Sequence, residues 1–188
     1  MEYSVSTLKA NTIQAATGSI VSVAAGHTFA PAGHVIQTKS FVLTSTTSST
    51  STSFVDTGLE LAITPSSTTS KILVTGFLNV SSSYFKTYVL LLRGGTTLSV
   101  GDAASNRPQV YASTNPGGSD WDSYNVTAVP LNFLDSPNTT SSVTYKTQYR
   151  PYLNSAATGY INRSARDRDN ADYDERSISV RTLQEIAA

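Results

Sequence analysis

The chain has 188 residues, with thirteen basic side chains, thirteen acidic side chains and no cysteine. This length favours one domain plus a modest extension. The balanced charge argues against nucleic acid or anionic lipid as a partner. The lack of cysteine excludes disulfides and thiolate metal sites.

Serine and threonine account for 54 residues, whereas charged residues make up only 14% of the chain. Threonine favours strands and serine favours turns, so the composition predicts β-structure with a polar, weakly charged surface. No apolar run approaches the roughly 20 residues that a membrane-spanning helix needs. The first six residues lack the basic start and apolar core of a signal peptide, so we expect synthesis in the cytoplasm.

Residues 1–35 form a weakly apolar segment that cannot bury much surface alone, and ordering it as an isolated strand would be costly. We expect an N-terminal arm that pairs with copies of itself or lies on a partner surface. The alternative is a strand tail folded back on the domain. The candidate anchoring residues are the larger apolar side chains of the arm, namely Leu8, Ile13, Ile20, Val23 and Phe29.

Regular strand signals begin near residue 36 and continue to the end of the chain, which defines a second region, 36–188. Residues 44–53 are all serine or threonine and are expected to form a polar edge strand or loop. Gly94-Gly95 predicts a hairpin turn. The closing strand is expected to alternate through Ile178, Val180 and Thr182, with a shift near Leu183 and Ile186. The expected strands cover residues 41–43, 54–56, 59–63, 70–80, 84–93, 96–100, 125–134, 142–150, 159–163 and 177–186.

These strands recur every 10–15 residues or so, and no segment has a helical pattern. The pattern predicts an all-β fold, an antiparallel jelly-roll sandwich. The run Tyr88 to Leu92 is apolar at every position, so both of its faces are apolar. Such a strand either contributes to a subunit interface, with Tyr88, Leu90 and Leu92 as candidate trimer contacts, or is covered by a loop of its own chain.

Catalytic chemistry is not indicated. The two histidines, His27 and His34, both fall in the arm, and one chain cannot assemble a catalytic triad or histidine metal site from them. A trimer could gather three copies of one histidine around a metal, but a polar arm residue is the simpler interpretation. We therefore predict a non-enzymatic protein with no catalytic residue, metal or cofactor.

Five carboxylates lie within residues 166–175, and calcium prefers oxygen-rich loops of this kind. The segment lacks the glycine and glutamate spacing of a helix-loop-helix calcium site, and its arginines would neutralise the acids. Local or inter-subunit ion pairs are the favoured interpretation, and calcium binding is left open.

Residues 115–124 form a Gly/Pro-rich loop that contains the chain's one tryptophan. Exposed aromatic and carboxylate groups suit the binding of sugars or proteins. The alternative is that Trp121 closes the end of the sandwich. The candidate receptor contacts are Asp120, Trp121, Asp122 and Tyr124.

Several short segments resemble bacteriophage fibre and structural proteins, notably those of cyanobacterial and marine phages. Residues 5–14 (VSTLKANTIQ) resemble the start of such proteins, and residues 23–37 (VAAGHTFAPAGHVIQ) resemble the lead-in before the end domain of a tail fibre. Residues 98–104, 133–137, 160–164 and 182–187 resemble parts of the C-terminal domain of the same group. The resemblance implies a jelly roll that trimerises about a three-fold axis, and it implies no catalytic residues.

On this basis the sequence predicts a homotrimer on the exterior of a phage virion, made in the host bacterial cytoplasm. The first functional hypothesis is a tail fibre or receptor-binding tip that recognises a host glycan or protein, with its arm attached to the tail or baseplate. The second is a decoration or cement protein bound to the major capsid protein. A sugar-cleaving spike using Asp102, Asp120 or Asp122 and a free-standing lectin are weaker alternatives. Neither nucleic acid nor membrane insertion is expected.

Overall fold

The computed structural model describes residues 31–114, 125–152, 157–169 and 172–188. All of them belong to one compact unit, Pro31–Ala188. Within these residues the chain forms strands and no helix. The strands are β1 (Val35–Leu43), β2 (Thr47–Ser49), β3 (Val55–Ile63), β4 (Lys71–Ser82), β5 (Thr87–Arg93), β6 (Thr96–Thr97), β7 (Ala112–Thr114), β8 (Thr127–Asp135), β9 (Val143–Pro151), β10 (Gly159–Ile161) and β11 (Ser179–Ile186).

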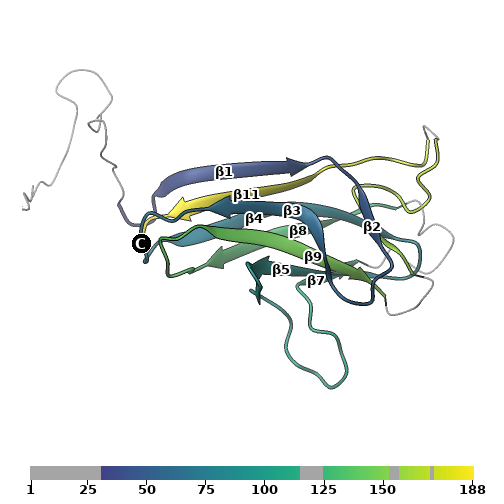
Figure 1. Cartoon of the computed structure of the whole chain (residues 1–188), viewed down its shortest axis with the longest axis horizontal. Helices are drawn as coiled ribbons and strands as arrows, with labels where there is room; N and C mark the ends of the chain where they lie inside the picture. Colours follow the sequence, from purple (N-terminus) through teal and green to yellow (C-terminus); the bar gives the residue numbers. More distant parts are fainter. Residues whose placement is uncertain (1–30, 115–124, 153–156, 170–171) are drawn as a thin grey trace, which may run out of the picture. The chain divides into compact units, whose positions relative to one another are not determined.

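The strands form two antiparallel sheets packed as a β-sandwich, so the all-β sandwich expected from the sequence is present (Figure 1). In the first sheet β4 pairs with β8 on one side and with β11 on the other, and β1 pairs with β11. The short strands β10 and β2 extend this sheet beside the last residues of β4. In the second sheet β9 lies between β3 and β5, and β6 and β7 pair with the far side of β5.

Strict alternation along the strands builds the core between the sheets. On β4 the side chains of Ile72, Val74, Leu78 and Val80 are fully buried, whereas Leu73, Thr75, Phe77 and Asn79 alternate onto the outer face. β-branched and leucine side chains pack well on a pleated surface that is covered on one face.

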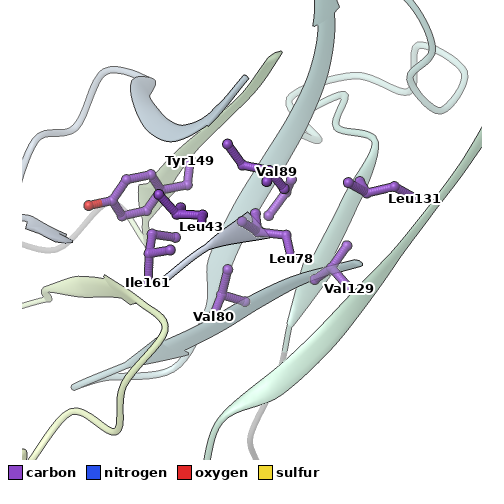
Figure 2. Close-up of a cluster of buried hydrophobic side chains, with 9 residues drawn as sticks. Leu43, Leu78, Val80, Val89, Val129, Leu131, Tyr149 and Ile161 are labelled. Atoms are coloured by element: carbon purple, nitrogen blue, oxygen red, sulfur yellow. The ribbon is translucent and has the colours of Figure 1, made fainter. Parts of the chain in front are cut away.

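The buried side chains form two clusters. The first, drawn in Figure 2, contains Leu43, Leu59, Leu78, Val80, Val89, Val129, Leu131, Tyr149 and Ile161. The second contains Ile63, Ile72, Val74, Leu91, Tyr145 and Leu183. Each cluster draws residues from both sheets, so the core itself holds the two layers together.

Several expected boundaries differ from the observed ones. β1 begins at Val35, before the expected residue 41, because pairing with β11 extends it. The segments expected at 54–56 and 59–63 form the single strand β3, which carries a register irregularity between Asp56 and Glu60, with Gly58 at a positive φ of 85°. Such an irregularity is the mark of a β-bulge, which glycine accommodates readily.

The turn regions differ as well. The strand expected from residue 84 begins only at Thr87, and the one expected at 96–100 ends at Thr97. The Gly94-Gly95 hairpin is present, because Arg93 pairs directly with Thr96. Part of the Ser/Thr run forms the short strand β2.

The chain enters and leaves the sandwich at the same end, which we call the terminal end. There the Gly33 amide donates to the Ala187 carbonyl at 2.8 Å, and the Ala187 amide donates to the His34 carbonyl at 2.8 Å. The opposite end, at the right of Figure 1, is where β1, β4, β7 and β9 finish. We call it the loop end.

Candidate recognition surface

The loop end collects the connections that follow β1, β4, β7 and β9, because antiparallel pairing directs these four strands the same way. Connections of this kind lie on the surface and carry binding residues more often than the strands that support them. The connection between β4 and β5 exposes the aromatic side chains of Tyr84 and Phe85, and the segment that leads from β10 into β11 exposes Tyr173.

The turn between β4 and β5 has a strained backbone. Phe85 has a φ of 65°, and the Lys86 amide donates to the Tyr84 carbonyl at 3.0 Å across it. A hydrogen bond between residues i and i+2 around a central residue at positive φ is the pattern of the uncommon, strained γ-turn. For a bulky residue such a backbone is an outlier, and outliers of this kind cluster at functional sites.

The surrounding residues hold this turn in place. The Ser82 hydroxyl donates to the Tyr84 carbonyl at 2.8 Å and accepts from the Tyr84 amide at 3.2 Å. The Tyr152 amide donates to the Lys86 carbonyl at 2.8 Å, which ties the turn to the end of β9. The strain is therefore imposed by hydrogen bonds on both sides of Phe85.

The side chains of this turn form a small surface with both apolar and polar groups. The Phe85 and Tyr152 rings meet edge to face with their centroids 5.2 Å apart, and the Lys86 ammonium lies 5.2 Å from the Phe85 centroid. Tyr84 is 51% exposed and Phe85 is 39% exposed. We call Tyr84, Phe85, Lys86 and Tyr152 the aromatic tip.

The aromatic tip has the chemistry of a binding surface. Its rings offer apolar faces, its tyrosines carry hydroxyl groups, and its lysine supplies a cation. Rigid aromatic side chains lose little conformational entropy on binding, which makes them effective contact residues.

Close by, the outer face of the second sheet carries a stacked arginine. The Arg150 guanidinium lies 4.5 Å from the Tyr88 ring centroid and 5.1 Å from that of Phe54. Of the predicted trimer contacts, Tyr88 and Leu90 are half-buried, whereas Leu92 is 5% exposed in the single chain. Tyr88 and Leu90 therefore retain surface that a second subunit could cover.

The acidic segment at the loop end is occupied by local ion pairs. Asp167 accepts from Arg176 at 2.6 Å and from Arg163 at 3.2 Å. Asp174 accepts from Arg168 at 3.0 Å and from the Ser164 hydroxyl at 3.0 Å. Burial alone would raise the pKa of Asp174, but these two partners outweigh it and hold the pKa below its usual value.

These pairs agree with the interpretation of the segment as a set of local ion pairs. Among the described residues, no three His, Asp or Glu side chains gather closely enough to hold a metal ion. Within the same residues, no helix is long and apolar enough to cross a membrane.

The other predicted site residues fall in different places. Asp120, Trp121, Asp122 and Tyr124 lie outside the described residues, as do the arm residues Leu8, Ile13, Ile20, Val23 and Phe29. Their roles stay predictions. Asp102 is exposed in the connection that follows β6.

Sequence reasoning missed the aromatic tip because residues 84–86 were assigned to a strand. The signal was the preceding Ser81-Ser82-Ser83, since serine favours turns through its hydrogen bonds to nearby backbone. Tyr152 could not have been linked to Phe85 without knowing that β5 pairs with β9.

No protein-family model matches the chain, and no curated protein matches it significantly in sequence. Among solved structures, the chain is similar to a chain of the infectious bursal disease virus Gt strain structure, with a TM-score of 0.38 and 12% identity. It is also similar to the infectious bursal disease virus VP2 subviral particle, with a TM-score of 0.32 and 11% identity.

The matches cover 82% and 81% of this chain but only 43% and 42% of the viral chains, so this chain spans less than half of their length. Similarity at this level does not establish a relationship. The description of the fold therefore rests on the strand pairing alone.

Proposed function

We propose that the chain is a non-enzymatic structural protein of a bacteriophage particle. In this proposal it is a jelly-roll homotrimer that attaches through its N-terminal region and recognises the host surface with its loop end. The observation that carries the proposal is that the two ends of the sandwich differ. The chain enters at the terminal end, whereas the aromatic tip lies at the loop end. A receptor-binding tip needs this separation between attachment and recognition.

The strand order supports the jelly roll. The principal strands follow the order β1-β11-β4-β8 in one sheet and β3-β9-β5-β7 in the other. Apart from the step from β5 to β7, each principal strand is followed by a principal strand of the other sheet. Double-sheet jelly rolls of eight strands have this interleaved arrangement.

The trimer is proposed from the outer face of β5, where Tyr88 and Leu90 keep exposed surface beside the stacked Arg150. Aromatic residues and arginine are enriched in protein interfaces. Light scattering of the full chain tests this, with an expected mass of three times 20.0 kDa.

Leu90→Glu should dissociate the trimer, whereas Leu134→Glu should leave it intact, because Leu134 is 51% exposed on the outer face of the other sheet. A monomeric wild type, or a trimer lost only in Leu134→Glu, would contradict the proposed interface.

Recognition by the aromatic tip is tested with Phe85→Gly. Glycine tolerates the positive φ of this position, so the variant should fold normally while it loses the ring. Binding to an array of bacterial surface saccharides should fall at least tenfold in Phe85→Gly and stay unchanged in Val100→Ala, whose side chain is 40% exposed in the connection after β6. Full binding by Phe85→Gly would count against the aromatic tip.

The second candidate is a capsid decoration or cement protein, and a specific surface favours it. On the outer face of the first sheet, Val42, Val180, Phe77 and Pro130 form one cross-strand row over four strands. The neighbouring row, Ser40, Thr182, Thr75 and Asn132, is polar but uncharged. Two adjoining cross-strand rows without a charged residue suit docking on another virion protein.

The copy number of the chain in purified virions separates the two candidates. Few trimers per particle support the tail location, and many trimers spread over the head support decoration.

A further inference from the structure

The interior of the sandwich contains an arginine that forms no ion pair with any acid of the described residues. Arg181 lies on the inward face of β11 between Ser179 and Leu183, and its side chain is fully buried. On the neighbouring strands it is paired with Gly76 of β4 and Phe41 of β1. Alternation along the strands therefore directs a cation between the two sheets.

The row that contains Arg181 separates the two core clusters. On β4, Gly76 stands between Val74 of the second cluster and Leu78 of the first. On β9, Thr147 likewise stands between Tyr145 and Tyr149. The middle of the core thus has a residue without a side chain and a small hydroxyl side chain where large apolar groups would otherwise meet.

Gly76 is required at its position. A Cβ atom there would lie 2.0 Å from the Val180 carbonyl oxygen, and the φ of 135° is unfavourable for other residues. The Thr147 hydroxyl is already engaged, at 2.7 Å from the Thr57 hydroxyl. Both residues are thereby fixed, and neither supplies an acceptor to the arginine.

The guanidinium of Arg181 has no hydrogen-bond acceptor among the described residues, since Nε, Nη1 and Nη2 all lack one. No carboxylate of the described residues forms an ion pair with it. Glu60 of β3 is the acid whose charge acts on Arg181, but Glu60 is exposed to solvent. Burial lowers the pKa of Arg181 to about 10, so the group stays charged at neutral pH.

The other buried charged groups differ from Arg181 in this respect. Glu185 accepts hydrogen bonds from Gln37 and from both the amide and the hydroxyl of Ser66. Asp135 accepts from Arg93 and Tyr145. Buried charges in proteins are almost always paired in this way, because an unpaired one is very costly. Arg150, the remaining buried charge of the described residues, has no acid partner but donates to the Pro151 carbonyl at 3.3 Å and stacks on Tyr88 and Phe54. Arg181 is therefore the one buried charged group of these residues that has no hydrogen-bond partner.

We propose that Arg181 binds a small monovalent anion of the chloride class inside the sandwich. One negative charge would neutralise the single guanidinium, whereas a divalent anion would leave an excess charge in the core. A small ion needs the least room between the two sheets, and the fork of N–H donors can hold it without a second cation. The site is formed by β11 and the middle row of the core, well apart from the aromatic tip on the β4–β5 turn.

The test compares the unfolding of the full chain in sodium chloride and in sodium gluconate at equal ionic strength. The folding equilibrium should shift toward the native state by 1 + [anion]/Kd, which is about tenfold when chloride is at roughly nine times its Kd. Arg181→Met should lose this chloride-specific shift. Glu60→Gln should keep it, because the proposal assigns the neutralising charge to the anion.

Crystals grown in sodium bromide provide a second test that needs no variant. An anomalous peak within hydrogen-bond distance of the Arg181 guanidinium is the expected result. Equal stability in the two salts, a water molecule in place of bromide, or a wild type whose stability depends on Glu60 and not on chloride would each overturn the proposal.

Discussion

The Tyr145 hydroxyl donates a 2.6 Å hydrogen bond to the Asp135 carboxylate and so joins the two sheets through a buried acid. Arg93 donates to the same carboxylate oxygen at 2.7 Å. Burial raises the pKa of Tyr145, and the hydrogen bond to Asp135 raises it further, so the hydroxyl stays protonated and remains a donor. The three groups form a charge-assisted network at the edge of the core.

Replacement of Tyr145 by phenylalanine removes one donor from this network and leaves the ring in place. We expect Tyr145→Phe to lower the free energy of unfolding by about 2 kcal/mol, the usual contribution of a hydrogen bond to a charged group. Urea denaturation measures it. Tyr84→Phe is the matched control, since Tyr84 is 51% exposed, and it should change stability by less than about 0.5 kcal/mol. Equal effects of the two variants would show that the Asp135 network adds nothing.

Gly76→Ala should be strongly destabilising, because the new Cβ atom would collide with the backbone of β11 and the φ of 135° disfavours alanine. We expect a loss of about 3 kcal/mol or more in the free energy of unfolding, or failure to fold. Gly95→Ala serves as the control, since Gly95 has open space around its Cα and no positive φ. Thermal unfolding of both variants distinguishes a local steric requirement from a general intolerance of substitution.

Asn162 connects three segments at the loop end. Its side-chain amide donates to the carbonyls of Leu43 and Ser45 at 2.8 and 3.0 Å, and its oxygen accepts from the Ser179 hydroxyl at 2.6 Å. Asn162→Asp would place a carboxylate against two carbonyl oxygens in a buried site, and we expect a loss of about 3 kcal/mol. Asn132→Asp, on an exposed residue, should be nearly neutral in the same denaturation experiment. If Asn162→Asp unfolds at the wild-type midpoint, the proposed connection is wrong.

Acid should destabilise the protein in part through Glu185. Burial alone would raise the pKa of Glu185, but hydrogen bonds from Ser66 and Gln37 outweigh it and hold the pKa below its ordinary value of 4.5. A carboxyl group whose pKa is lower in the folded state stabilises that state above the unfolded pKa, and this stabilisation is lost as the pH falls through the folded pKa. The free energy of unfolding should therefore decline below about pH 4.5.

The decline should be shallower in Glu185→Gln, which has no carboxyl group to protonate. Some decline should persist because of Asp56. Burial alone would raise the pKa of Asp56, but Gln148 and Lys146 together outweigh it and lower the pKa. Denaturation series from pH 7 to pH 3 would provide the comparison. Parallel curves for the wild type and the variant would exclude a contribution from Glu185.

The sequence predicted the long strands well, because alternation over eight or more residues is a strong signal. β4 and β9 lie within one or two residues of their expected positions. The three-residue strands β2, β7 and β10 are too short to show a period. β10 was expected as part of a longer segment, β2 lies in the run expected to form an edge strand or loop, and β7 was not expected.

The closing strand shows why pattern alone was insufficient. Ile178, Val180 and Thr182 suggested one face and a shift near Leu183, yet β11 alternates without a shift through buried Ser179, Arg181, Leu183 and Glu185. Two charged residues on the inward face cannot be anticipated from hydrophobicity. Their burial depends on Gly76, Ser66 and Gln37, which are distant in sequence.

The loop end was only partly predictable. The arginines and carboxylates of residues 163–176 suggested local ion pairs, and those pairs are present. The aromatic tip depends on a γ-turn, for which Ser81-Ser82-Ser83 is the local signal, and on the pairing of β5 with β9, which no local pattern encodes. Contact between strands that are distant in the sequence is the information that the sequence lacked.

The hydrogen bonds between Gly33 and Ala187 and between Ala187 and His34 have a practical consequence. Cargo fused after residue 188 would emerge beside the point where the sandwich begins, and the connections around Phe85 would remain uncovered. The domain therefore offers a platform for peptide display. The turn at residues 84–86 could be exchanged for foreign peptides, while the two points of fusion, before Gly33 and after residue 188, stay at the opposite end.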